Sequence, residues 1–180
     1  MVAGPLCRIH ESMNPTPKTL ILVRHAKSSW ADPHLTDHER PLNKRGLDDA
    51  PKMARRLAKR GERPDQVVTS SALRALETAK VFASKLEVAD RPLVVEPKIY
   101  GAGVDELVEL IRGFDEGLGS VLVVGHNPTL SELCHRITGE ELGELSTCSV
   151  VTLRVPSGTW GSVGRAKLDL FDLDYPKKKK

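Results

Sequence analysis

The chain has 180 residues, of which 39% are hydrophobic and 28% are charged, as in ordinary globular proteins. No apolar run approaches the roughly 20 residues of a membrane-spanning helix, so a membrane partner is not expected. A chain of this length can bury roughly 70% of its unfolded surface in one core. We therefore predict a flexible leader at residues 1–18, a single domain at residues 19–175 and a disordered basic tail at residues 176–180.

The net charge of +3 comes from the C-terminal run Lys177–Lys180. Without these four lysines the chain has 23 basic and 24 acidic residues, so the domain itself is close to neutral. Proteins that bind nucleic acids carry a basic face or groove, and none is evident here. A nucleic-acid partner is not expected.

The cysteines and the first residues favour a cytoplasmic location. Cys7, Cys134 and Cys148 are odd in number and form no C-x-x-C pair, which suits reduced thiols better than a disulfide framework. The N-terminal residues lack the contiguous apolar core of a secretory signal.

Short apolar runs with turn-forming borders predict buried strands at residues 19–23, 66–70, 92–96 and 120–125. Two later stretches with more alternation, 149–155 and 162–173, predict two further strands. Helical periodicity predicts helices at residues 47–59, 72–86, 104–112 and 128–137. The alternation predicts an α/β fold, with a mostly parallel central sheet of about six strands and helices on both faces, in three layers.

Pro51 interrupts the apolar stripe of the first predicted helix. The helix either kinks at this proline or begins late, with Asp48 or Asp49 as its cap and Pro51 in the first turn, where a missing N–H costs little. The sequence leaves both alternatives open.

Cationic side chains follow three of the predicted strands. Arg24 and His25 come after the first strand, Arg74 follows the second within "SSALR", and His126 follows the fourth within "GHNP". Ligands of open α/β sheets bind beyond the carboxyl ends of the strands. We therefore expect these four side chains to lie along one edge of the sheet, where they would hold an anion such as phosphate.

Two of these positions also have the sequence of a helix start. Ser71 is a good N-cap for the helix that opens with "ALR", and Asn127 followed by Pro128 reads as N-cap and first helical residue. A helix start exposes unpaired N–H groups that favour anions. Each feature alone also has an ordinary structural explanation, such as a polar strand end or a solvent-facing arginine, but their combination favours a phosphate pocket.

Four segments, "LVRHAKSSW", "RPLNKRG", "SSALRALETA" and "VVGHNP", resemble in order and spacing the histidine phosphatase superfamily, which has the phosphoglycerate mutase-like fold. The resemblance covers about residues 19–173 and is greatest to the short SixA-like branch, the phosphohistidine phosphatases. It implies a phosphatase that needs neither a metal nor another cofactor.

The resemblance also implies roles for the four cationic residues. His25 would be the nucleophile that attacks phosphorus in line, and Arg24, Arg74 and His126 would bind the equatorial phosphoryl oxygens. These roles agree with the chemistry, because phosphoryl transfer depends on positioning and charge stabilisation. A neutral imidazole can form a phosphohistidine intermediate that water then hydrolyses.

The sequence departs from the wider family beside the predicted nucleophile. Many members have a glycine and an acid after the Arg-His pair, whereas Ala26 and Lys27 stand here. Lys27 and Ser28 are therefore candidate substrate-binding residues, together with Asn127, although Lys27 could equally lie at the pocket rim. A general acid is not evident, and the sequence does not rank the four candidate carboxylates, Asp32, Asp37, Glu39 and Glu96.

A missing general acid bears on the substrate. An alkoxide leaving group needs a proton, whereas the imidazole of a phosphohistidine leaves more easily. We therefore predict a cytoplasmic phosphatase that acts on phosphohistidine of a protein and releases inorganic phosphate. The alternatives are a broad phosphomonoesterase for small phosphate esters, a phosphoprotein-binding module and a mutase. The presence of His25 argues against the binding module, and the short chain argues against the mutase.

Three other motifs suggest rival chemistries. Cys148 and Arg154 have the C-x-x-x-x-x-R spacing of cysteine phosphatases, but the intervening "SVVTL" predicts a strand rather than a phosphate loop. The "DLD" at residues 172–174 stands at the chain's end and is interpreted as surface acid. His34 and His38 have metal-ligand spacing, yet their polar surroundings favour an exposed loop. No metal site is predicted, and no Walker loop indicates ATP.

Overall fold

The computed structural model describes residues 16–178, and most of the predicted leader lies outside this range. Its centre is a six-stranded sheet in the order β3-β2-β4-β1-β5-β6. The strands are β1 (Lys18–Arg24), β2 (Gln66–Thr69), β3 (Leu93–Val95), β4 (Ser120–Gly125), β5 (Val150–Val155) and β6 (Asp169–Asp174). The first four in chain order run parallel, whereas β5 is antiparallel to β1 and β6 is antiparallel to β5. The predicted mostly parallel sheet is confirmed.

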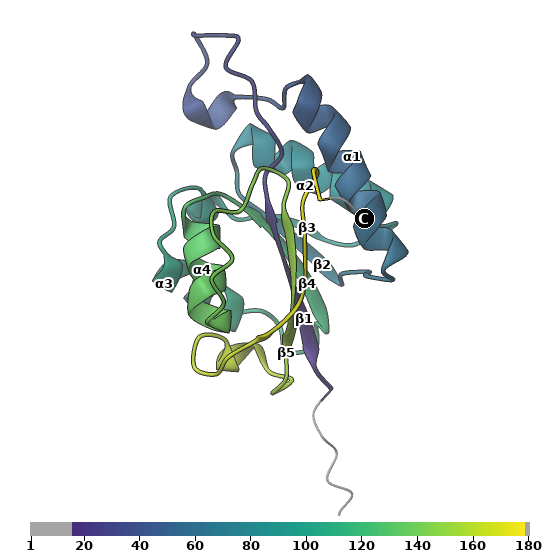
Figure 1. Cartoon of the computed structure of the whole chain (residues 1–180), viewed down its shortest axis with the longest axis vertical. Coiled ribbons are helices and arrows are strands. Elements are labelled where there is room, and N and C mark those ends of the chain that lie inside the picture. The colour runs from purple at the N-terminus through teal and green to yellow at the C-terminus, as the bar shows by residue number, and fades with distance from the viewer. Residues whose placement is uncertain (1–15, 179–180) are drawn as a thin grey trace, which may run out of the picture.

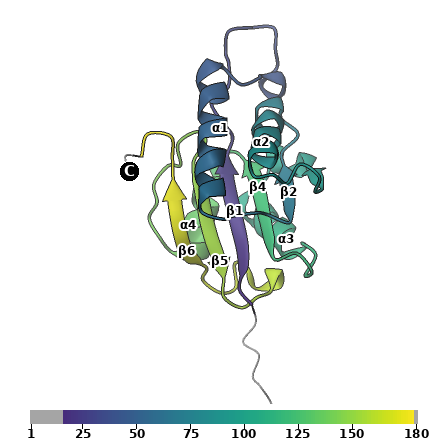
Figure 2. The same ribbon diagram turned by 90° about the vertical axis from the view of Figure 1, so that its right-hand side faces the viewer.

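Helices cover both faces of the sheet, as predicted. Figures 1 and 2 show α1 (Lys44–Lys59) and α2 (Leu73–Lys85) on one face, and α3 (Val104–Arg112) and α4 (Thr129–Thr138) on the other. Side chains of β1 alternate between the two faces. Ile21 and Val23 belong to the core under α1 and α2, while Leu20 and Leu22 belong to the core under α3 and α4. No helix among residues 16–178 is long and apolar enough to cross a bilayer.

Two elements differ from their predicted bounds by more than one residue at an end. α1 begins at Lys44, because the side chain of Asn43 accepts a hydrogen bond from the N–H of Gly46 at 2.9 Å and caps the helix. Pro51 therefore lies inside the helix, and neither Asp48 nor Asp49 is its cap. The last strand begins only at Asp169, because a 3-10 turn, Trp160–Ser162, and a turn bridged between Val163 and Ala166 come before it.

A long connection from β1 to α1 lies beyond the carboxyl edge of the sheet (Figure 2). Its two ends are held together, since the N–H of Ser29 donates to the Pro41 carbonyl at 2.8 Å and that of Asn43 donates to the Lys27 carbonyl at 3.0 Å. We call residues 26–43 the β1–α1 loop. It includes the short 3-10 helix η1 (Asp37–Glu39).

Gly46 lies against the base of this loop, and its replacement by alanine should destabilise the protein. An added Cβ would lie 2.2 Å from the Lys27 carbonyl oxygen, so the helix start or the loop must move. We expect the free energy of unfolding to fall by about 1–3 kcal/mol, as measured by urea denaturation. Gly101→Ala is the matched control, because nothing lies within 4 Å of an added Cβ there. Equal losses in both variants would contradict the close approach.

Candidate active site

Three of the four predicted phosphate-binding side chains meet at the carboxyl edge of the sheet. His25 follows β1, Arg74 lies in the first turn of α2, and His126 follows β4. The Nε of Arg74 donates to the Nε2 of His25 at 3.3 Å. The rings of His25 and His126 have centroids 5.0 Å apart. One phosphoryl group could therefore contact all three side chains.

His25 has one ring nitrogen engaged by the backbone. Its Nδ1 lies 2.7 Å from the Ala26 carbonyl oxygen, so Nδ1–H donates and the Nε2 lone pair faces Arg74. The pKa of His25 is lowered to about 4, chiefly by burial and also by the positive charges of Arg74 and Arg24, while the bond to Ala26 raises it. The imidazole is therefore neutral near pH 7, as an attacking nitrogen must be.

His126 is also held neutral. Its Nε2 lies 2.8 Å from the Ser70 hydroxyl, while its Nδ1 is buried without a hydrogen-bond partner among the described residues. Burial lowers the pKa of His126 to about 3, with further contributions from His25 and Arg74. A buried polar nitrogen without a partner is costly, so a ligand oxygen bound at this position would satisfy it.

These two pKa shifts make stability depend on pH. Both histidines have a lower pKa in the folded protein than in the unfolded chain, so the unfolded state binds more protons below about pH 6.5. The stability that the two neutral histidines contribute is therefore fully present above that pH. It is lost progressively as the pH falls toward 4. We compare the free energy of unfolding at pH 7.5 and pH 4.5, measured by urea denaturation. We expect the decrease between these pH values to be about 2 kcal/mol smaller in His126→Asn than in the wild type. His135→Asn changes an exposed ring and should retain the full loss; identical losses in all three proteins would contradict the burial effect.

Arg24 directly precedes His25, but part of its guanidinium group points to the loop before β5. Its Nη1 pairs with the Glu144 carboxylate at 3.1 Å and also donates to the Leu145 carbonyl. Its Nε is buried and has no partner within residues 16–178. The Nη1 of Arg24 is therefore held by the loop before β5, while its buried Nε–H would be satisfied by an anion bound beside it.

Arg40 is a site residue that the sequence reasoning missed. Its side chain is only 8% exposed, and its guanidinium carbon lies 3.4 Å from the ring centroid of Trp30. One nitrogen donates to the Ser28 hydroxyl at 3.0 Å, whereas Nε and Nη1 are buried without partners in the described chain. Arg40 stands in "RPLNKRG", but a loop arginine has no periodicity that would reveal its burial.

Asp37 connects the arginines of the site. Its Oδ2 accepts from Arg74 Nη2 at 2.9 Å and from the Tyr100 hydroxyl at 2.8 Å. Its Oδ1 lies 3.2 Å from Arg40 Nη2. Partial burial opposes ionisation of Asp37, but the hydrogen bonds from Tyr100 and Arg74 outweigh it and lower its pKa. Asp37 is thus a carboxylate at pH 7, which removes it as a general acid and makes it a support for the guanidinium groups.

The other three candidate acids are engaged in their own turns. The Asp32 carboxylate accepts from the N–H of His34, Glu39 from Thr36, and Glu96 from the N–H of Lys98. Tyr100 was missed by the sequence reasoning, although it lies just beyond the third strand. Its ring lies 5.6 Å from that of His126, and applying the carboxyl-end rule to β3 would have found it.

The remaining predicted substrate-binding residues have different surroundings. Lys27 is exposed, which agrees with a place at the rim. Ser28 is buried and its hydroxyl holds Arg40. Asn127 donates from Nδ2 to the Leu145 carbonyl at 3.0 Å, while its buried Oδ1 has no partner in the described residues. Their contacts with substrate remain predictions.

The predicted helix caps are wrong. α4 is capped by Pro128 rather than by Asn127, whose side chain bonds to the loop before β5. α2 is capped by Ala72 without a side-chain bond, because the Ser71 hydroxyl instead meets His38 Nε2 at 2.9 Å. The side chains of Ser71 and Asn127 bond instead to residues distant in sequence. A local sequence pattern does not predict such partners.

The rival motifs do not form sites. Cys148 precedes β5 rather than lying in it, at φ 63°, and burial raises the pKa of its thiol. The "DLD" segment is not simply surface acid, since Asp174 is buried and ion-paired with Arg56 and Arg60 at 3.0 Å each. Within residues 16–178, no group of three or more histidine, cysteine or acidic side chains could hold a metal ion.

Comparison with known proteins assigns the family. The sequence model of the histidine phosphatase superfamily (branch 1) matches residues 20–100. An uncharacterized protein of Mycobacterium tuberculosis H37Rv is 32% identical over 78% of this chain and 91% of its own length. The chain belongs to the histidine phosphatase superfamily. An uncharacterized chloroplastic protein of Arabidopsis thaliana is 30% identical over 79% of this chain and 69% of its length.

Solved structures agree with this histidine phosphatase assignment. A protein assigned as the phosphohistidine phosphatase SixA of Agrobacterium tumefaciens is 28% identical, with a TM-score of 0.76 over 88% of this chain and 98% of that one. The phosphoglycerate mutase of Bacillus anthracis is 16% identical, with a TM-score of 0.62 over 84% of this chain and 98% of that one, which confirms the expected fold. The chain is therefore a SixA-like phosphatase, with a phosphorylated compound as substrate and phosphate as product.

Proposed function

We propose that this phosphatase acts on phosphohistidine of a protein, through a covalent phosphohistidine on its own His25. The observation that carries the proposal is the Nε2 of His25, which belongs to a buried neutral imidazole and faces Arg74 at 3.3 Å. In the first step Nε2 forms a bond to phosphorus while the bond from phosphorus to the substrate imidazole breaks. In the second step water attacks the phosphorylated His25 and releases inorganic phosphate.

The surrounding cations suit both steps. Arg74, Arg40 and Arg24 supply guanidinium groups that match phosphoryl oxygens, and charge stabilisation of this kind is the main demand of phosphoryl transfer. Two nitrogens of Arg40 and one of Arg24 are buried without partners in the described chain. Binding of a dianionic phosphoryl group would satisfy such donors. A SixA structure of 22% identity was solved with tungstate, an oxyanion that resembles phosphate.

The leaving group is inferred from the carboxylates. Asp37 is ionised by its bonds to Tyr100 and Arg74, so it has no proton to give to an alkoxide. An imidazole leaving group needs such help less than an alkoxide does. A cytoplasmic location also fits the proposal, because Cys134 and Cys148 are free and buried.

A comparison of three substrates tests the function. We expect kcat/KM for a phosphohistidine protein to exceed that for a phosphoserine peptide or a sugar phosphate by about 100-fold, because only the first has a good leaving group. Acid-labile, alkali-stable phosphate should be trapped on the wild-type enzyme during turnover. Equal rates on all three substrates would contradict the phosphohistidine preference, and a labelled residue other than His25 would contradict the mechanism.

A further inference from the structure

A hollow of about 300 Å³ is lined by Glu144, the ion-pair partner of Arg24. Three parts of the chain form its walls: the first turn of α1, the loop before β5 and the segment after β6. The lining residues are Arg45, Leu142, Glu144, Leu145, Ser149 and Leu173, together with Ser146, Tyr175, Pro176 and Lys177. Nothing in the proposed mechanism uses this space.

The hollow and the candidate active site share a wall. Glu144 and Leu145 line the hollow, and the same two residues receive the Nη1 of Arg24. The Leu145 carbonyl also accepts from Asn127, which directly follows His126. The hollow and the candidate active site are therefore linked through Arg24 and Asn127.

The far wall of the hollow is fixed in place. Asp174 is 3% exposed and pairs with both Arg56 and Arg60 of α1. The next residues are bound to the same helix, since Lys52 Nζ donates to the Pro176 carbonyl at 3.0 Å. Residues 174–176 are thus bonded to side chains of α1 and its C-cap, and they border the hollow.

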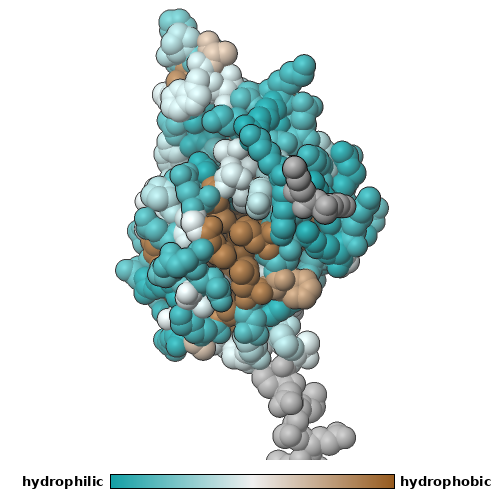
Figure 3. Space-filling view, in the orientation of Figure 1, coloured by the Kyte–Doolittle hydropathy of each residue, from teal (hydrophilic) through white to brown (hydrophobic). Residues whose placement is uncertain are grey.

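The lining is apolar in its middle and basic at its rim. Leu142 and Leu173 are only partly buried, and Tyr175 is 38% exposed. Figure 3 shows an apolar area on this face, between α4 and the C-terminal strand. The rim carries two exposed cations: Arg45, whose Nε pairs with Asp49 at 3.2 Å, and Lys177. The carboxylate of Glu144 is paired with Arg24. An occupant with apolar groups and negative charges complements this surface.

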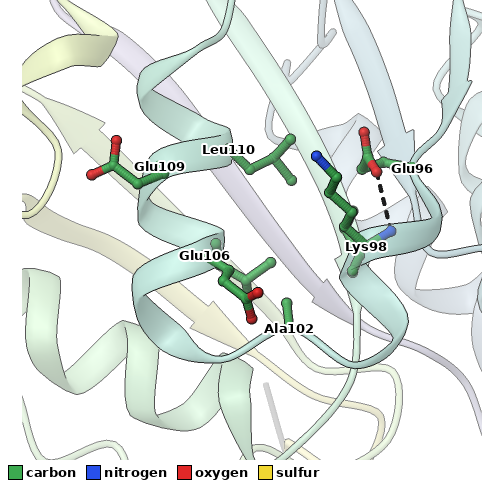
Figure 4. A pocket seen from close by; sticks show the side chains of 8 residues that line it. Glu96, Lys98, Ala102, Glu106, Glu109 and Leu110 are labelled. Atoms are coloured by element: carbon green, nitrogen blue, oxygen red, sulfur yellow. Dashed lines mark hydrogen bonds between the residues drawn. The ribbon is translucent and has the colours of Figure 1, made fainter.

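A second hollow, between the 3-10 turn Pro97–Tyr100 (η2) and α3, fits such an occupant less well. Its volume is about 390 Å³ and Figure 4 shows its lining. Its lining includes Glu96, Glu106 and Glu109, whose negative charge disfavours an acidic occupant. The Glu96 carboxylate accepts a hydrogen bond from the N–H of Lys98, and the Glu106 carboxylate accepts one from the N–H of Gly103. Lys98 is a single cation on this surface, so the second hollow serves as an internal control.

We propose that the hollow beside Arg24 binds a segment of the substrate protein that carries apolar and acidic side chains next to its phosphohistidine. This inference rests on the proposed function. Leu142 and Leu173 receive the apolar side chains, and Arg45 and Lys177 meet the acidic ones. Because the contacts lie outside the phosphoryl site, they select among phosphoproteins and do not change the chemical step.

Two synthetic phosphohistidine peptides test the inference. One has leucine and glutamate flanking the phosphohistidine, and the other has serine and lysine at the same positions. We expect the wild type to prefer the first by about fivefold to tenfold in kcat/KM, as two exposed ion pairs and some apolar burial would give. The double variant Arg45→Gln, Lys177→Gln should lose most of this preference. Lys98→Gln, in the second hollow, should retain it.

The outcomes separate this inference from the proposed function. If the wild type hydrolyses both peptides equally well, or if the double variant keeps the full preference, the docking surface is wrong while the phosphohistidine activity stands. If neither peptide is hydrolysed faster than p-nitrophenyl phosphate, the proposed function itself fails. A preference that disappears in Lys98→Gln would move the docking surface to the hollow beside α3.

Discussion

Replacing His25 by alanine should lower kcat for phosphate ester hydrolysis by about 10³- to 10⁶-fold, the range found when a covalent nucleophile is removed. The physical reason is that Arg74, Arg40 and His126 can still bind the phosphoryl group but nothing remains to attack it. The phosphorylated enzyme should disappear at the same time. Rates from steady-state kinetics and acid-quenched labelling measure the two effects.

Two further variants make this result specific to the nucleophile. His25→Asn retains a side-chain N–H that can bond to the Ala26 carbonyl, so its fold should survive while its activity is lost as in the alanine variant. His135→Ala removes an exposed ring that pairs with Glu141 and should retain wild-type activity. An alanine variant at His25 with more than about a tenth of the wild-type rate would contradict the assignment.

The positions of the strands explain why much of the candidate site could be predicted. Each strand that precedes a cationic site residue is short, apolar and largely buried, so its bounds are readable from the sequence. β1, β2 and β4 are neighbours and parallel, so their carboxyl ends meet. Arg74 and His126 are therefore brought to His25 by sheet topology alone.

The parts that the sequence did not predict lie in the β1–α1 loop and beyond β3. Arg40 and Asp37 reach the site because the ring of Trp30 stacks on Arg40 and Asp37 bonds to Arg74. These are side-chain contacts between segments without regular periodicity. Tyr100 belongs to the same network. Its place after β3 follows from the carboxyl-end rule, but its bond to Asp37 does not. Such contacts depend on tertiary placement, which no local pattern specifies.

The network of arginines and Asp37 sets the electrostatic potential around His25. Arg24, Arg40 and Arg74 place three positive charges around one imidazole, and all three lower the pKa of His25. Asp37 offsets part of the repulsion between Arg40 and Arg74 while it holds both guanidinium groups. The Asp37 carboxylate binds Nη2 of Arg74, so Nε of Arg74 stays directed at His25. The loop thus orients the cations before a phosphoryl group binds.

Replacing Arg74 by alanine should therefore lower kcat/KM by about 10³-fold, the lower end of the range for removal of an arginine that stabilises a phosphoryl transition state. Arg74→Lys should recover little, because an ammonium cannot bond both to Asp37 and to His25 in the geometry of a guanidinium. Loss of this charge should also raise the pKa of His25.

Asp37→Asn provides the comparison that separates binding from positioning. It keeps Arg74 but weakens the bonds that orient it, so we expect a loss of only about tenfold to 100-fold in kcat/KM, with kcat affected more than the inhibition constant for tungstate. In Arg74→Ala both quantities should deteriorate, because a phosphate-binding group is gone. Arg63→Ala, at an exposed pair with Glu87, should match the wild type. If Arg74→Ala bound tungstate as tightly as the wild type, Arg74 would not be a phosphate-binding residue, and the anion would have to be held by Arg24 and Arg40.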